Sequence, residues 1–178
     1  ATTGESNGQE ILETLERNNL FIIPLDNRRE WYRYHHLFAD MLRHRLEKQH
    51  SDLLSSLYRR AFEWHIEADL YEHSIFYALR GQMYTEAADV VEKIGHQTYY
   101  RNLAGTVGEW LQQIPDPIIE TRPRLRILQV LILIDRGEIR AVEESLERLE
   151  RYLAEHPFSD EAKNLEFEGQ IRAMQSAV

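Results

Sequence analysis

The chain has 178 residues, which is long enough for one large helical domain or for a small domain followed by a larger one. It has no cysteine, which excludes disulfides, thiol catalysis and cysteine-bearing zinc sites and favours a reducing compartment, so we expect a cytoplasmic protein. The net charge of −9 argues against non-specific nucleic-acid binding by the whole surface, and no stretch approaches the roughly 18 consecutive apolar residues of a membrane span.

The first fifty residues predict a winged-helix unit. Residues 9–19 place apolar side chains at helical spacing and end in two asparagines. Residues 20–25 (LFIIPL) and 31–34 (WYRY) flank a polar turn, which is typical of a β-hairpin, and Pro24 fits only where its missing N–H faces away from the partner strand. The next apolar residues predict one stripe of a second helix: Leu37, Phe38, Met41, Leu42 and Leu46.

The rest of the chain predicts antiparallel helices. We expect one helix over 83–95, another over 99–115 that is stopped by prolines, and a helical hairpin over 122–157 that turns at Arg136 and Gly137. Glycine and proline are few, which agrees with a helical protein.

Two spacings in this part suggest a repeat. Pro123 and Pro157 are 34 residues apart, which is the length of a tetratricopeptide unit, and an Arg–Gly pair closes predicted helices at 80–81 and at 136–137. We therefore interpret residues 52–178 as the beginning of an α-solenoid. Its strongly apolar run LQVLILI predicts further repeats after Val178, because each repeat buries its faces against its neighbours.

The motifs of common enzymes are missing. The sequence has no phosphate loop, no nucleophile elbow and no dinucleotide-binding glycine pattern, so we expect no catalytic residues. His35 and His36 are adjacent and should point apart, while His36 and His44 are two helical turns apart. Because the HExxH spacing is missing and Asp40 is the one nearby carboxylate, we expect no metal site.

A winged helix that reads DNA is an alternative. Arg28 and Arg29 at the tip of the wing could contact phosphates, but the helix expected to enter the major groove carries Glu10, Glu13 and Glu16. The basic residues are better explained by pairing with acids on another domain. Tyrosines of the later helices, including Tyr99 and Tyr100, are expected to pack between helices, although a few could line the inner groove of a solenoid.

The string ILETLERNNLFIIPLDNRREWYRYHHLFADMLRHRL resembles the winged-helix segment of MalT-like regulators of the LuxR family, which are large signal-transduction (STAND) ATPases. The string LYRRAFEWHIEADLYEHSIFYALRGQMYTEAADVVEK is similar to the helical region that joins that segment to their sensor. GEWLQQIPDPIIETRPRLRILQVLILIDRGEIRAVEESLERLE resembles the first helical pairs of the sensor solenoid, although helical repeats are less diagnostic.

The resemblance implies a mainly α protein in three parts: a winged-helix domain over residues 1–50, a helical arm over 51–120 and the start of tetratricopeptide-like sensor repeats over 121–178. In the family, an N-terminal module with a phosphate loop holds ADP at rest and ATP after a small-molecule or protein inducer binds the sensor. The protein then oligomerises, and a C-terminal helix-turn-helix binds promoter DNA. The chain would be an internal fragment without either module and without a cofactor of its own, and it would couple the nucleotide state to the sensor.

One residue role follows from the resemblance. Related switch ATPases use a winged-helix histidine to contact the β-phosphate of ADP, and the matching position in RYHHLF is His35. Alternatively, His35 caps the helix that begins near Leu37 or packs beside Trp31, and His36 fits the phosphate role less well. The rival functions are a winged-helix protein that binds DNA directly and a tetratricopeptide-like scaffold that captures a partner peptide.

Overall fold

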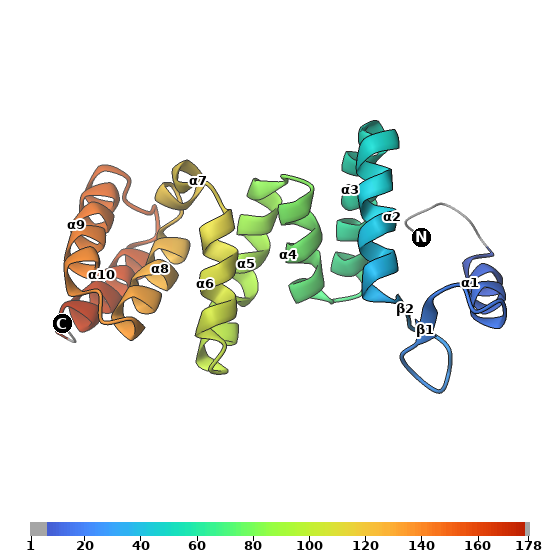
Figure 1. Cartoon of the computed structure of the whole chain (residues 1–178). Coiled ribbons are helices and arrows are strands. Elements are labelled where there is room, and N and C mark those ends of the chain that lie inside the picture. Colours follow the sequence, from blue (N-terminus) through green and yellow to red (C-terminus); the bar gives the residue numbers. More distant parts are fainter. Residues whose placement is uncertain (1–6, 177–178) are drawn as a thin grey trace. The chain divides into compact units, whose positions relative to one another are not determined.

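In a computed structural model that describes residues 7–176, the chain is mainly helical, with ten helices and one two-stranded antiparallel sheet in that range (Figure 1). The described residues form two compact units that divide between His73 and Ser74, inside helix α4 (Tyr71–Arg80). The predicted domain boundaries after residues 50 and 120 stay predictions. None of the helices in the described range has the length and apolarity needed to cross a bilayer.

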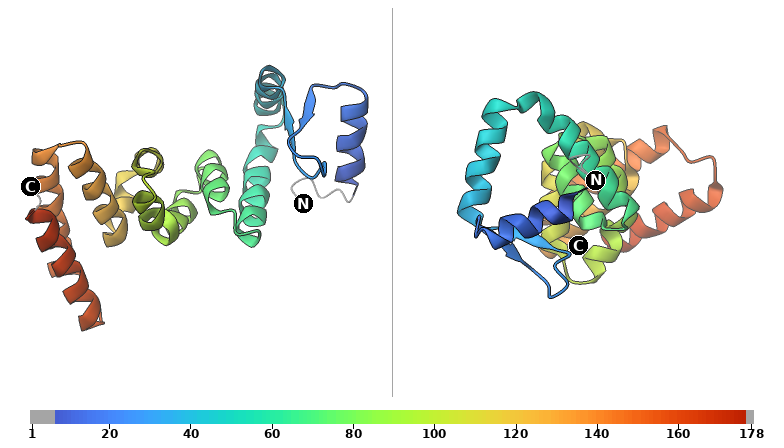
Figure 2. Two further views of the ribbon diagram at one scale, coloured as in Figure 1. Left: turned by 90° about the horizontal axis from the view of Figure 1, so that it is seen from below. Right: turned by 90° about the vertical axis from the view of Figure 1, so that its right-hand side faces the viewer.

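The first unit is the predicted winged helix. Its elements before α4 are α1 (Gly8–Arg17), β1 (Ile22–Pro24), β2 (Tyr32–Tyr34), α2 (His36–Gln49) and α3 (Ser51–Glu67). Helix α1 lies along β1, and α2 packs on α3 (Figure 2). The hairpin and both flanking helices lie where the sequence predicts them, within a few residues at each end.

The hairpin explains why a proline is tolerated in β1. Pro24 lies opposite Tyr32 in the register. The N–H of Leu25 donates to the Trp31 carbonyl at 2.8 Å, and the N–H of His35 donates to the Phe21 carbonyl at 2.7 Å. Because hydrogen-bonded and non-hydrogen-bonded pairs alternate along an antiparallel ladder, Pro24 occupies a non-hydrogen-bonded position. Its missing N–H faces away from β2, as predicted.

A polar cluster fastens the hairpin to α1. The Glu16 carboxylate accepts a hydrogen bond from Arg29 Nε at 3.1 Å and from the Tyr32 hydroxyl at 3.2 Å. Gln9 Nε2 donates to the Arg29 carbonyl at 2.8 Å. The hydrogen bond and the charge of Glu16 raise the pKa of Arg29, whereas burial, followed by Glu16, raises the pKa of Tyr32. Arg29 therefore has an acidic partner within its own unit, and the predicted pairing of the basic residues with another domain stays a prediction.

The predicted apolar stripe of α2 is only half correct. Phe38, Leu42 and Leu46 are partly buried, but Leu37 is 68% exposed and Met41 is 53% exposed. Helical spacing places all five on one broad face, and α3 covers only one side of it. An uncovered apolar edge therefore runs along the first half of α2.

The second unit is a solenoid of antiparallel helices that begins in α4. The helices after α4 are α5 (Tyr84–Tyr100), α6 (Ala104–Gln113), α7 (Asp116–Glu120), α8 (Pro123–Asp135), α9 (Ile139–Glu155) and α10 (Glu161–Gln175). Helix α8 is central and contacts α5, α6, α7 and α9. Its Leu125, Leu128 and Val130 are fully buried, whereas Leu131, Leu133 and Ile134 of the apolar run LQVLILI are only partly buried. The further repeats predicted from this run stay a prediction.

One type of tight turn, called a corner below, recurs after the last residues of several helices. Each corner has a residue with left-handed backbone whose successor bonds to a carbonyl five residues back, which is a Schellman motif. The left-handed residues are Asn19, Asp69, Gln82, Asn102 and Gly137. At the first Arg–Gly pair, Arg80–Gly81, the left-handed residue is Gln82, which follows the glycine. At the second pair it is the glycine, Gly137. The two pairs are therefore out of register by one residue, and the repeated dipeptide does not mark a repeat.

The predicted boundary between 95 and 99 is wrong. Helix α5 continues through Gly95 to Tyr100, and the corner comes at Asn102. Gly95 instead allows α5 and α8 to approach each other, because a Cβ atom there would lie 2.6 Å from Leu128 Cδ1. The predicted turn of the later hairpin at Arg136 and Gly137 is correct.

Candidate functional site

His35 lies at the junction between β2 and α2. It occupies the N-cap position of α2, but its side chain makes no capping hydrogen bond. Its backbone carbonyl accepts from the N–H of Phe38 at 3.0 Å and of Ala39 at 2.9 Å, and its N–H donates to Phe21. The backbone of His35 is thus fixed on both sides, while its imidazole is exposed.

The two adjacent histidine rings lie together, contrary to the prediction that they point apart. The ring centroids of His35 and His36 are 4.4 Å apart, with 31° between the ring planes. Because the helix begins between them, neither strand nor helix geometry applies to the pair. Within residues 7–176, neither ring has a recorded hydrogen-bond partner. The imidazole of His35 does not pack against Trp31, whose ring meets Trp64 at 6.4 Å.

The backbone opposite His35 is strained. Phe21 has a φ of 56°, which is an outlier for a bulky residue. Its ring meets the ring of Phe38 in a tilted arrangement with the centroids 5.0 Å apart, and the ring centroids of Phe38 and Tyr34 are 5.7 Å apart. Strained backbone persists only where the surroundings hold it, and it gathers at functional sites. The contacts of Phe38 with Phe21 and Tyr34 hold the start of α2 against the hairpin.

The environment of His35 suits an anion. The N-terminus of a helix carries partial positive charge and free N–H groups, and the two imidazoles add further donors. Across the described part of the chain, no group of three or more histidine or acidic side chains is arranged to hold a metal ion. What the junction offers is therefore hydrogen-bond donation to a negatively charged group.

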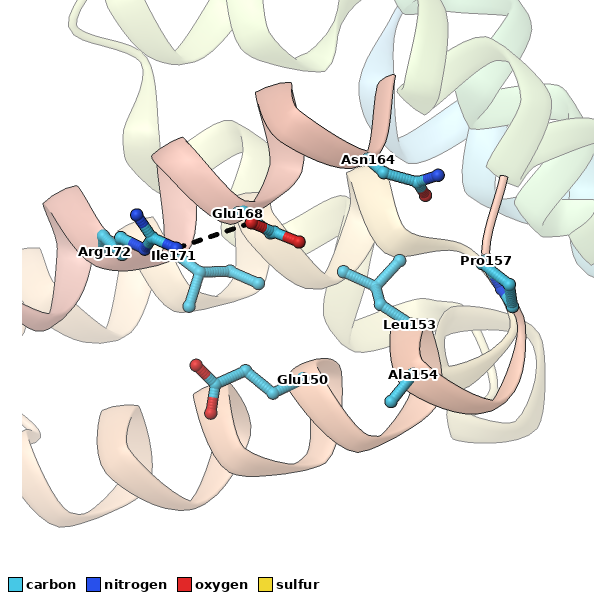
Figure 3. Close-up of a pocket in the computed structure, with 8 residues that line it drawn as sticks. All are labelled: Glu150, Leu153, Ala154, Pro157, Asn164, Glu168, Ile171 and Arg172. Atoms are coloured by element: carbon cyan, nitrogen blue, oxygen red, sulfur yellow. Dashed lines mark hydrogen bonds and ion pairs between the residues drawn. The ribbon is translucent and has the colours of Figure 1, made fainter. Parts of the chain in front are cut away.

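The solenoid carries separate pockets of its own. One, of about 550 Å³, lies between α9 and α10, and there the Arg172 guanidinium is paired with Glu168 at 3.5 Å (Figure 3). Another, of about 570 Å³, is lined by α5, α8 and α10 and contains His96 and Arg124. Sequence reasoning missed this second pocket, although it suggested that Tyr100, which lines the rim, might face a groove.

Comparison with known proteins assigns the first part of the chain. Residues 1–54 match the family model described as the MalT winged helix domain. The chain is 30% identical over 172 residues, or 96% of its length, to the HTH-type transcriptional regulator MalT of Yersinia pestis (strain Pestoides F) and to that of Yersinia pseudotuberculosis serotype O:1b (strain IP 31758). No solved structure matches it significantly.

A protein of another kind shares much of the same stretch. The serine/threonine-protein kinase PknK of Mycobacterium tuberculosis (strain CDC 1551 / Oshkosh) is 30% identical over 127 residues, which is 71% of this chain and 11% of the kinase. The chain spans about a fifth of the length of the MalT regulators, since 19% of each is matched. The sequence of residues 1–54 is thus similar to the MalT winged helix domain, and the chain is similar along nearly its whole length to MalT transcriptional regulators.

Proposed function

We propose that this chain is a non-catalytic coupling segment of a MalT-like transcriptional regulator, which links the nucleotide state of a STAND-type ATPase module to a tetratricopeptide-like sensor of inducer. The observation that carries the proposal is the placement of His35. Its backbone is fixed by Phe21, Phe38 and Ala39, while its imidazole is exposed at the N-terminus of α2. A phosphate brought to this point would meet an N–H donor held in a defined position.

The similarity to two kinds of protein supports a regulatory role. One relative is named as a transcriptional regulator and the other as a protein kinase, so the two proteins have different activities. A segment that both proteins share is better suited to regulating an activity than to carrying out DNA binding or phosphorylation. ADP or ATP would be held by the ATPase module of the parent protein, promoter DNA would be bound by its helix-turn-helix, and activation would involve oligomers in the cytoplasm.

The coupling would begin at the His35 junction. A contact between His35 and a phosphate would pull on the start of α2, and α3 packs on α2. A γ-phosphate would alter that contact and release the helix pair.

The DNA-reading alternative is weaker. Arg29 at the wing is held by Glu16 of α1, which leaves it less available for phosphate. A steep salt dependence of duplex binding by the chain would favour this alternative. A scaffold that captures a partner peptide remains the other rival, since solenoids present extended surfaces.

The decisive experiment measures ADP and ATP affinity in the full-length parent protein by calorimetry. We expect His35→Ala to weaken ADP binding by about 10- to 150-fold, because a charge-assisted hydrogen bond contributes about 1.5–3 kcal/mol, and to change ATP binding much less. His44→Ala is the matched control, since His44 is an exposed histidine on the same helix. Equal ADP affinity in wild type and in folded His35→Ala would refute the phosphate contact.

A further inference from the structure

The pocket between α5, α8 and α10 has an apolar floor. Its volume is about 570 Å³, which lies in the range of small-molecule sites. On α8 the lining residues recur at intervals of three and four, so they form one stripe, in which Ile127 is buried and Leu131 and Ile134 are partly buried. The apolar lining residues of α8 and α10 include Ile127, Leu131, Ile134, Phe167 and Met174.

Three ionisable groups lie in the same pocket, one from each helix. His96 comes from α5, Arg124 from α8 and Glu166 from α10. Burial, and then the charge of Arg124, lower the pKa of His96, while Glu166 acts in the opposite direction. His96 is therefore neutral near pH 7 and offers one N–H donor and one acceptor.

Arg124 is the unpaired cation of this group. Among the described residues no carboxylate lies within 4 Å of its guanidinium, although Glu166 lines the same pocket. Glu166 is instead bonded by Gln170 Nε2 at 3.3 Å. The pocket thus combines apolar walls with a guanidinium whose planar fork matches a carboxylate.

We propose that this pocket binds a small amphipathic carboxylic acid, with its apolar body on the floor formed by α8 and α10 and its carboxylate at Arg124. His96 would donate a second hydrogen bond to the carboxylate. Glu166 would repel a second negative charge, so the pocket selects monoanions over dianions. Tyr100, which is 72% exposed at the rim, gives the ligand an additional aromatic contact.

The other large pocket lacks this combination. Between α9 and α10 (Figure 3), Arg172 is already paired with Glu168, and Glu150 adds another carboxylate. That pocket has no cation free to select a ligand charge. The proposed site lies entirely within the unit after Ser74 and requires no nucleotide, so it stands or falls independently of the role of His35.

The test uses the whole chain and two probes of equal length, decanoate and the uncharged decanamide. Calorimetry should show decanoate binding about tenfold more tightly, because the carboxylate gains a charge-assisted contact. Arg124→Gln should abolish that preference. Ala173→Trp, which fills the pocket from an exposed position on α10, should weaken both probes. Arg140→Gln, an exposed arginine on α9 outside the pocket, should behave as wild type.

A second readout locates the ligand. Bound decanoate should raise the pKa of His96 in an NMR titration, because a nearby negative charge favours the imidazolium, and decanamide should not. Equal affinity for both probes, a preference that survives Arg124→Gln, or binding unaffected by Ala173→Trp would overturn the proposal. Concentration-dependent dimerisation that Ala173→Trp abolishes, without decanoate binding, would also overturn it by assigning the pocket to a second copy of the chain.

Discussion

Because α5 and α8 approach each other closely at Gly95, Gly95→Ala should destabilise the wild type but stabilise a variant in which Leu128 is shortened. A Cβ on Gly95 would lie 2.6 Å from Leu128 Cδ1, well inside ordinary contact, and Leu128 is fully buried. Overpacking of this kind costs about 1–3 kcal/mol, while replacing a helical glycine by alanine gains about 1 kcal/mol. Gly95→Ala should therefore destabilise the helical unit by about 0–2 kcal/mol.

The second substitution removes the obstacle. Leu128→Ala alone should cost about 2–5 kcal/mol because it leaves a cavity. In that background both δ-carbons are gone, and the next contact of the new Cβ is Val91 Cγ1 at 3.3 Å, which needs only a small shift. Gly95→Ala should then stabilise by about 1 kcal/mol, so the two changes are coupled by about 1–3 kcal/mol.

The assay must report the helical unit separately. Trp110 is buried in α6, whereas Trp31 and Trp64 belong to the first unit. With 5-fluorotryptophan, urea unfolding can be followed at each site by fluorine NMR. Gly169→Ala in α10 is the control, since nothing lies within 4 Å of its Cβ position, and it should stabilise by about 1 kcal/mol. If Gly95→Ala stabilises the wild type as much as this control, the close approach is wrong.

Other substitutions test the polar contacts. Glu16→Gln should lower the unfolding midpoint at Trp31 only slightly, because Arg29 is largely exposed and solvent screens its ion pair, and should leave the midpoint at Trp110 unchanged. An equal loss at both sites would contradict this expectation. Arg122→Ala removes hydrogen bonds from Nη1 to Asp89 at 2.6 Å and to Glu92 at 3.1 Å. The free energy of unfolding reported by Trp110 should therefore fall by about 1–3 kcal/mol, whereas Arg140→Ala should leave it unchanged. Burial, and then the hydrogen bond to Asp135, raise the pKa of Tyr99 to about 12. The stability that the raised pKa of Tyr99 provides is complete below pH 10 and is lost as the pH rises through about 12. Asp135→Ala should lower the pKa of Tyr99 in a carbon-13 NMR titration. An unchanged pKa would exclude the hydrogen bond between Tyr99 and Asp135.

Local signals in the sequence predicted much of the fold. The hairpin, the place of Pro24 in it and the turn at Gly137 each depend on the backbone of a few neighbouring residues, and the structure confirms them. The wrong predictions depend on distant contacts. The helix predicted over 83–95 ends too early, because the contact that requires Gly95 is with Leu128 on another helix. Nor does spacing along α2 reveal which side of it α3 covers.

The candidate sites follow the same division. The position of His35 came from the resemblance of RYHHLF to a known family, and its phosphate contact stays a prediction that only the nucleotide-bearing parent can test. The pocket around Arg124 was missed because its lining comes from helices separated by many residues. An earlier signal was available in Arg124, Ile127, Leu131 and Ile134, whose spacing places one arginine in line with an apolar stripe.

The compact corners limit where the length of this chain can change. Between α4 and α5, α5 and α6, and α8 and α9, few residues separate the helices, and the left-handed residue is Gln82, Asn102 or Gly137. One inserted residue there would rotate the next helix by about 100° and turn its apolar face out of the core. The connection between α9 and α10, at residues 156–160, is longer and should tolerate insertions, reporter tags and natural length differences best, provided that they leave Phe158 on Phe167 and bonded to Asn164.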